Sequence, residues 1–168
     1  MSREDIDRFF NEYVFGFIFN DVQREIDLAA SGKTAGNFLA ALGLLCYTEV
    51  MGGIRRTTLK QGNGRCNFET FLRYMGDQYG ALLDADPPLD VYRDFRCGMA
   101  HEYLTKGAPP FVTMLNGAES AGVGRLPGGR LHFCVQRYFE DFAPACHRLY
   151  AELRCEPDPK LPRQIAGR

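Results

Sequence analysis

The chain has 168 residues, of which 45% are hydrophobic and 24% charged, and its formal net charge is −1. This length and composition are those of a single globular domain with enough apolar side chains for a core. The small net charge excludes a protein that binds nucleic acid or anionic membrane through its overall charge, and leaves room only for a local basic patch.

The N-terminus, MSREDIDRFF, lacks the basic start and apolar run of a secretory signal peptide. The longest strongly apolar stretch spans residues 13–19. It is far too short to cross a bilayer, which takes about 20 residues. We therefore expect a soluble, cytoplasmic protein without a membrane partner.

Apolar residues recur at three- and four-residue steps through most of the chain, which predicts a mainly helical fold. The first pattern follows Ser2 and runs towards residue 30, with Gly16 and Asn20 as points of interruption. A second helix begins near residue 38 and is expected to end at the MGG of residues 51–53.

The middle of the chain predicts two more helices. Asn67 is expected to cap a helix over residues 68–83, because asparagine is a preferred N-cap residue. Another helix is expected from Leu89 to about residue 107.

The next segment differs in character. The β-prone runs PPFVTMLN and RLHFCV flank the turn-rich GAESAGVGRLPGG, and together they predict a β-hairpin or two short strands. A last helix is expected over residues 136–154. The sequence thus predicts one helical domain, residues 1–155, with about five helices and a small β-hairpin insertion before the last one, followed by a flexible, proline-rich tail at 156–168.

Cysteine and histidine spacing predicts no metal or cofactor site. The six cysteines have no CxxC pair, and in a cytosolic chain we expect thiols that lie mostly in the core. His132 and His147 have no ligand spacing between them, so both are expected to be structural or surface residues.

The stretch FRCGMAHEYLTKG, residues 95–107, carries an unusual set of polar side chains for a helix. Arg96 and His101 are five residues apart, which separates them by about 140° around an α-helix. One straight helix does not direct both side chains at one atom. A second helix, or a second copy of the chain across a two-fold axis, would complete such a site.

This pair of residues suits phosphate chemistry. An arginine offers planar charged donors to phosphate oxygens, and a histidine exchanges protons near neutral pH. Together they could cleave RNA without a metal, through proton transfer by His101 and charge stabilisation by Arg96. The alternative is structural: Arg96 pairs with Asp94, Glu102 or Glu49, and His101 caps the helix end. The spacing leaves both open.

The order Arg, four residues, His, one residue, Tyr, carried by Arg96, His101 and Tyr103, resembles the signature of HEPN domains, including the toxin half of MNT–HEPN pairs. The resemblance covers residues 1–155 but is sharp only in this motif. It implies a small helical bundle, usually a homodimer in which the two motifs face each other.

The resemblance also implies an activity. Many HEPN proteins are metal-independent endoribonucleases of toxin–antitoxin, defence or RNA-processing systems, so Arg96 and His101 would be the catalytic pair. Tyr103 would be the tyrosine that a partner nucleotidyltransferase antitoxin modifies with AMP. Other members are non-catalytic modules that bind a nucleotide, RNA or a protein, and this is the alternative. The chain departs from the pattern at Cys97, where active members usually carry Asn, Asp or His, and a thiol is a weak hydrogen-bonding group.

Two further groups of residues complete the candidate site. Glu49 continues an apolar helical stripe, and an inward carboxylate needs a partner, for which Arg96 is the obvious choice. The pair would either support the site or form a plain structural salt bridge. The densest positive segment contains Arg55, Arg56, Lys60 and Arg65. It is either a track for an RNA backbone or a solvated loop.

Overall fold

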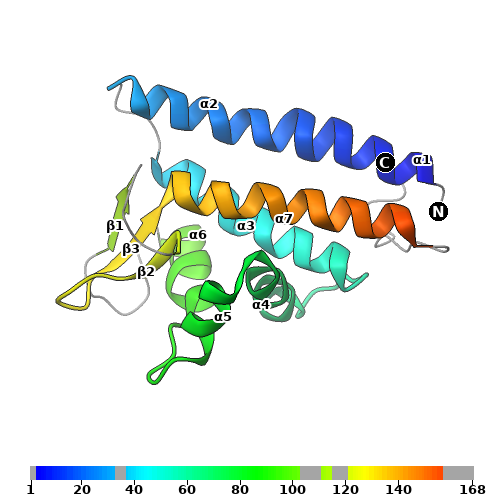
Figure 1. Cartoon of the computed structure of the whole chain (residues 1–168). Coiled ribbons are helices and arrows are strands. Elements are labelled where there is room, and N and C mark those ends of the chain that lie inside the picture. Colours follow the sequence, from blue (N-terminus) through cyan, green and yellow to red (C-terminus); the bar gives the residue numbers. More distant parts are fainter. Residues whose placement is uncertain (1–2, 33–36, 103–110, 115–120, 157–168) are drawn as a thin grey trace.

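The computed structural model describes residues 3–32, 37–102, 111–114 and 121–156 (Figure 1). The predicted fold class is confirmed: the chain is mainly helical, with a small hairpin before the last helix. Tyr103, the expected helix end near residue 107 and the proline-rich residues 157–168 lie outside the described residues.

The first helix is continuous and lies along one edge of the molecule (Figure 1). It consists of α1 (Arg3–Arg8), a π-helical segment η1 (Phe9–Ile18) and α2 (Phe19–Ala30). Gly16 and Asn20 do not interrupt it; the Asn20 side-chain amide donates to the carbonyl of Gly16 at 2.6 Å. The helix widens at η1 instead of breaking.

The widening explains an unusual burial pattern. The buried residues of this helix recur every four positions: Ile6, Phe10, Val14, Ile18, Val22 and Ile26. A four-residue repeat drifts one way around an α-helix, which has about 3.6 residues per turn, and the other way around a π-helix, which has more than four. Alternating the two forms therefore keeps the row facing the core along the whole helix.

The second helix, α3 (Asn37–Arg55), is the central one and packs on α2, α4 (Gly64–Met75) and α7 (Val135–Cys155). It does not end at residues 51–53 as predicted. A Cβ on Gly52 would lie 1.7 Å from the backbone oxygen of Asn67, so the glycines serve the close approach of α3 to α4. Phe38–Arg55 is long and apolar enough to cross a membrane, but half of it is buried within the bundle, the pattern of a core helix.

The third predicted helix differs at both ends. α4 begins at Gly64, so Asn67 is not its cap but a buried residue inside it. The Asn67 amide donates to the carbonyl of Thr58 at 3.0 Å, and its oxygen accepts from Arg56 at 2.6 Å. The backbone is extended at Gly76, where the helix stops and α5 (Asp77–Asp84) begins. A second π-helical segment, η2 (Tyr92–Cys97), then leads into α6 (Gly98–Glu102).

A three-stranded sheet precedes the last helix. Its strands are β1 (Phe111–Met114), β2 (Val123–Arg125) and β3 (Leu131–Cys134), in the order β1-β3-β2. β3 is antiparallel to β2 and parallel to β1. The hairpin is therefore confirmed, but its first arm comes from the segment that we expected to be a turn, and the two predicted runs pair in parallel.

The helix α7 agrees closely with its predicted range and fixes the first helix to the bundle. The Phe15 ring stacks on His147 at 4.2 Å between centroids, and Phe19 meets Phe139 edge-on at 5.5 Å. Cys134 and Cys146 are buried, whereas Cys66 and Cys155 are exposed, so the thiols are not mostly in the core as expected. His132 is buried in β3 and His147 is exposed on α7.

Candidate functional site

Arg96 and Glu49 form an ion pair, as the inward position of Glu49 predicted. Arg96 Nε lies 2.7 Å from Glu49 Oε2, and each side chain is 22% exposed. Both of these atoms are shielded from solvent and neither has a hydrogen-bond partner among the described residues, so the contact is an ion pair. Asp94, an alternative partner, instead accepts from Arg93 Nε at 2.9 Å.

The π-helical turn positions Arg96 beside an aromatic ring. Tyr92 begins η2 and Arg96 follows four residues later, which puts the two on one side of the widened turn. The Arg96 Cζ lies 5.9 Å from the centre of the Tyr92 ring, and the Arg65 Cζ lies 5.2 Å from it. Tyr92 therefore joins two guanidinium groups from different elements.

A glycine makes room for this group. Gly64 is the first residue of α4, and a Cβ there would lie 2.5 Å from the Tyr92 hydroxyl oxygen and 2.8 Å from Glu49 Oε1. The N-terminus of this helix thus lies against the carboxylate, where the helix dipole favours negative charge. We define the Arg96 cluster as Cys46, Glu49, Gly64, Tyr92, Arg96 and Cys97.

The cluster keeps Arg96 charged, and it keeps the Cys46 thiol and the Tyr92 phenol protonated. Burial opposes the charge on Arg96, but Glu49, together with Cys46, Tyr92 and Cys97, outweighs it and raises the arginine pKa. Burial raises the pKa of the Cys46 thiol against the opposing effect of Arg96. Burial also raises the pKa of Tyr92, and Glu49 and Cys97 add to this effect. The cluster therefore presents Arg96 as a permanent positive charge.

The structure describes less of the other two residues of the motif. His101 lies in α6, directly after the π-helical turn, but its side chain is outside the described part of the chain, as is Tyr103. The half-buried Cys97 belongs to the cluster through its contact with Tyr92. The pairing of Arg96 with His101 therefore stays a prediction.

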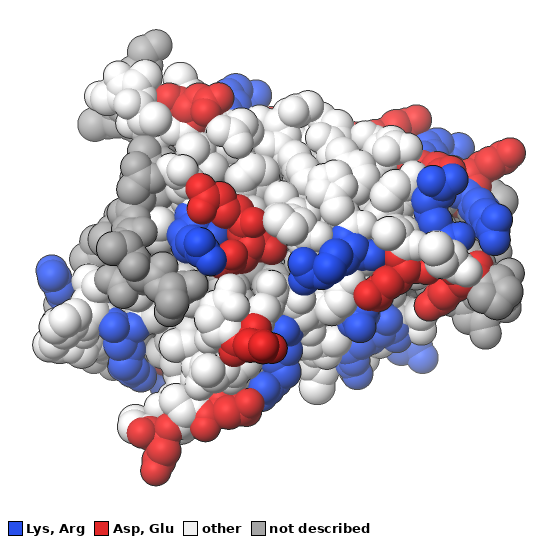
Figure 2. Space-filling model, viewed as in Figure 1, with Lys and Arg blue, Asp and Glu red and all other residues white. Residues whose placement is uncertain are grey.

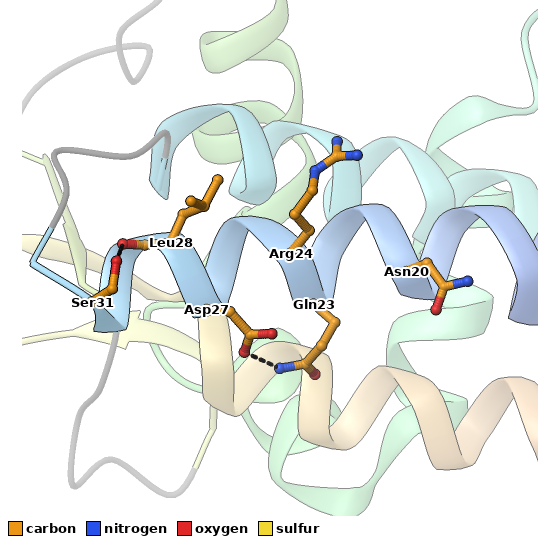
Figure 3. A pocket seen from close by; sticks show the side chains of 6 residues that line it. All are labelled: Asn20, Gln23, Arg24, Asp27, Leu28 and Ser31. Carbon is orange, nitrogen blue, oxygen red and sulfur yellow. Dashed lines mark hydrogen bonds between the residues drawn. The ribbon is translucent and has the colours of Figure 1, made fainter.

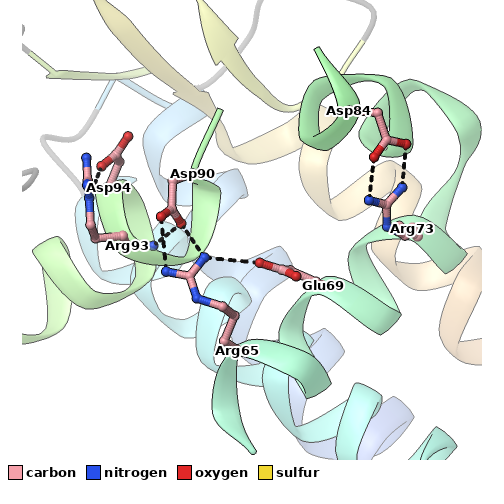
Figure 4. A network of polar contacts seen from close by, with 7 residues as sticks. All are labelled: Arg65, Glu69, Arg73, Asp84, Asp90, Arg93 and Asp94. Atoms are coloured by element: carbon pink, nitrogen blue, oxygen red, sulfur yellow. Dashed lines mark hydrogen bonds and ion pairs between the residues drawn. The ribbon is translucent and has the colours of Figure 1, made fainter. Parts of the chain in front are cut away.

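The basic segment does not form one strip. Arg65 makes two contacts with Asp90, at 2.7 and 3.0 Å, and one with Glu69 at 3.1 Å (Figure 4). Arg55 binds Glu152 on α7 at 2.6 Å and covers the Tyr74 ring at 3.9 Å. Arg65 and Arg55 therefore pair with different segments of the chain. Of these two residues, Arg65 is the one that lies next to the Arg96 cluster.

The remaining two basic residues lie between them. Arg56 is held by Asn67, and the backbone N–H of Lys60 approaches the Thr58 hydroxyl at 3.5 Å, in the loop before α4. Of the four basic residues of this segment, Arg65 is the one that lies beside the Tyr92 ring together with Arg96.

Other hollows lie away from the cluster. One runs along α2 and is lined by residues of that helix and by Ser31, which follows it: Asn20, Gln23, Arg24, Asp27, Leu28 and Ser31 (Figure 3). Two of its polar residues are already paired, since Gln23 donates to Asp27 at 2.8 Å. Among the described residues no group of three histidine, cysteine or acidic side chains could hold a metal ion.

Sequence reasoning missed three members of the cluster. Tyr92 and Cys46 could have been found from helical spacing, because they lie four residues before Arg96 and three before Glu49. Gly64 carries no such signal, since only the packing of α4 against α3 brings it to Glu49.

Comparisons of the chain with protein-family models, with curated proteins and with solved structures found no match.

Proposed function

We propose that the chain is a HEPN-like, metal-independent endoribonuclease of the toxin, defence or RNA-processing type, which acts in the cytoplasm as a homodimer. The observation that supports this proposal is the fixed position of Arg96, whose Nε is 2.7 Å from Glu49 Oε2 on a π-helical turn. A guanidinium that is oriented before the substrate arrives loses little freedom on binding phosphate, and preorganised charge is the main source of electrostatic catalysis.

The proposed reaction needs no metal. The His101 imidazole accepts the proton of a ribose 2′-hydroxyl, whose oxygen attacks the adjacent phosphorus to form a 2′,3′-cyclic phosphate. The bond between phosphorus and the 5′-oxygen breaks, and the imidazolium returns its proton to that oxygen. Arg96 compensates the charge that develops on the phosphate oxygens. Arg65, which also lies beside the Tyr92 ring, would contact the next phosphate of the RNA.

Two partners belong to this proposal. A second copy would supply His101 to the Arg96 of the first, as the resemblance to HEPN homodimers with facing motifs implies. A nucleotidyltransferase antitoxin that attaches AMP to Tyr103 would regulate the enzyme.

RNA cleavage in the presence of EDTA tests the proposal. We expect wild type to cleave single-stranded RNA, and Arg96→Ala and His101→Ala each to lose at least about a hundredfold in rate. Arg93→Ala is the matched control, because Arg93 lies on the same turn and pairs with Asp94 outside the cluster. A wild type that leaves RNA intact, or cleavage that survives both changes, rules the activity out.

A second candidate is a non-catalytic module that binds RNA, a nucleotide or a protein. The neutralisation of Arg96 by Glu49 favours it, as does the thiol of Cys97 next to the arginine. In that case RNA binds without being cut, Arg96→Ala weakens binding, and the affinity falls with added salt.

A further inference from the structure

A hollow of about 140 Å³ lies between α5 and the edge of the sheet. It is lined by Gln78 and Leu82 of α5, by the three residues of β2 and by His132 of β3, and we call it the hairpin pocket. A water molecule takes up about 30 Å³, so the hairpin pocket has room for about five waters or for one small ligand. None of these residues belongs to the Arg96 cluster.

The backbone of β2 turns part of its hydrogen-bonding groups towards this pocket. The Cys134 N–H donates to the Gly122 carbonyl at 2.8 Å, which fixes where the two strands bond to each other. Residues of an antiparallel pair alternate between those that bond to the partner strand and those that do not. Val123 and Arg125 fall between the bonded positions of the edge strand β2. Their N–H and C=O groups therefore point away from β3, and both residues line the pocket.

The ring of His132 reaches over β2 because that strand has a glycine there. His132 is only 2% exposed, and it lies opposite Gly124 in the register of the two strands, so both occupy one face of the sheet. A Cβ on Gly124 would lie 2.8 Å from His132 Cε1. The missing side chain thus leaves the space that the imidazole occupies at the wall of the pocket.

Tyr79 of α5 holds the pocket in shape. Its hydroxyl donates to Asp141 on α7 at 2.9 Å and accepts from the backbone N–H of Gly122 at 3.1 Å. The Tyr79 side chain is buried, so these contacts join α5, α7 and the start of β2 inside the protein. A ligand would meet walls that are already in place, which lowers the entropic cost of binding it.

The charge of the pocket favours an anion. Arg125 is the one charged residue among the described residues that line it, and Gln78 and His132 add side-chain nitrogen donors. The hairpin, residues 123–134, contains two arginines and no acidic residue. Figure 2 shows basic side chains at this end of the molecule.

We propose that the hairpin pocket binds a small anion through a carboxylate or phosphate group. Arg125 supplies the charge, because a guanidinium matches the geometry of both groups. The backbone N–H groups of β2, the Gln78 amide and the His132 imidazole donate hydrogen bonds to the remaining oxygens. Leu82 and Val123 contact the apolar part of the ligand. The site is separate from the one that the proposed function uses, so its occupancy is measured without RNA.

The first experiment is an NMR titration of the whole chain with inorganic phosphate and, separately, with propionate, at constant ionic strength. We expect the amide signals of Gly124, Arg125 and the Gln78 side chain to shift with a Kd of about 1 mM for at least one of these anions. Propionamide, the neutral analogue of propionate, should leave the signals in place. Shifts with neither anion, equal shifts with propionamide, or shifts confined to the Arg96 cluster overturn the proposal.

The second experiment repeats the titration on variants. Arg125→Gln should weaken binding at least about tenfold, because a charge-assisted contact is lost, and the exposed position makes a folded variant the expected outcome. Arg130→Gln is the matched control, an exposed arginine of the same hairpin that does not line the pocket, and should keep the Kd of wild type.

Gly124→Ala displaces the His132 ring and should also weaken binding, and its amide spectrum shows whether it is folded. A wild-type Kd in Arg125→Gln, or an equal loss of affinity in Arg130→Gln, overturns the proposal whether or not Gly124→Ala folds.

Discussion

At the scale of single residues, Glu49 decides how Arg96 is held. Glu49→Gln would remove the charge that offsets a half-buried guanidinium, and we expect it to cost about 1–3 kcal/mol of unfolding free energy. Urea unfolding followed by circular dichroism measures this cost. Glu69→Gln is the control, because Arg65 keeps its two contacts with Asp90 and an exposed pair contributes at most about 1 kcal/mol. Equal costs for both changes would show that Arg96 does not depend on Glu49.

A substitution at Gly64 should change the geometry of the Arg96 cluster while leaving the stability of the fold nearly unchanged. In Gly64→Ala the new Cβ meets the tips of Tyr92 and Glu49, which can move, so we expect a change in unfolding free energy within about 1 kcal/mol. RNA cleavage or binding should fall by about tenfold, because Arg96 loses its orientation. Gly80→Ala meets only the Arg73 Nη1 at 3.7 Å and should leave the RNA assay unchanged. Unaltered RNA activity in Gly64→Ala would separate the cluster from function.

At the scale of elements, the contact between α3 and α4 depends on Gly52. A Cβ there would meet backbone atoms, which cannot step aside, so Gly52→Ala should cost about 3 kcal/mol as the helices move apart. Gly43→Ala, on the same helix, meets Tyr47 at an ordinary 3.6 Å and should stabilise the protein by up to about 1 kcal/mol. Thermal unfolding measures both. A stable Gly52→Ala would contradict the close packing of the two helices.

The same elements show what the sequence could reveal. Periodicity located the first helix, α3 and α7, and the stripe of α3 led to the pairing of Glu49 with Arg96. It did not reveal that the helix continues through Gly52 and Gly53. Glycines predict the end of a helix unless the backbone that packs against them is known. Nor did it find β2, whose three residues carry too short a pattern. Gly64 joined the site through packing between distant segments, which a linear pattern does not record.

At the scale of the whole molecule, acidic residues link helices and make stability depend on pH. Burial tends to raise the pKa of Asp90, but Arg65 and the backbone N–H of Arg93 outweigh it and lower the pKa. Burial acts likewise on Glu152, and Arg55 and Tyr74 lower its pKa. A carboxyl whose pKa is lowered by folding stabilises the protein above its ordinary pKa of about 4, and this stabilisation is lost as the pH falls.

We therefore expect the unfolding free energy to be nearly constant from about pH 5 to 8 and to fall below about pH 4. Asp90→Asn should be less stable than wild type at neutral pH, and the difference should shrink on acidification, because both proteins are then uncharged at this position. Urea unfolding at a series of pH values measures it. Glu140→Gln is the control, since Glu140 contacts a neutral amide. A difference between Asp90→Asn and wild type that does not vary with pH would contradict the linkage.

The widened segment η1 also constrains how the length of this chain can change. Three rows run along it, and each has its own surroundings: Phe10, Val14 and Ile18 meet the core, Phe15 and Phe19 meet α7, and Tyr13 and Phe17 are open to solvent. Inserting one residue within η1 would rotate the side chains after it onto another face of the helix, so that each row would meet the surroundings of a different row. Inserting four would restore each row to its own, so viable length variants of this segment should differ in steps of four residues.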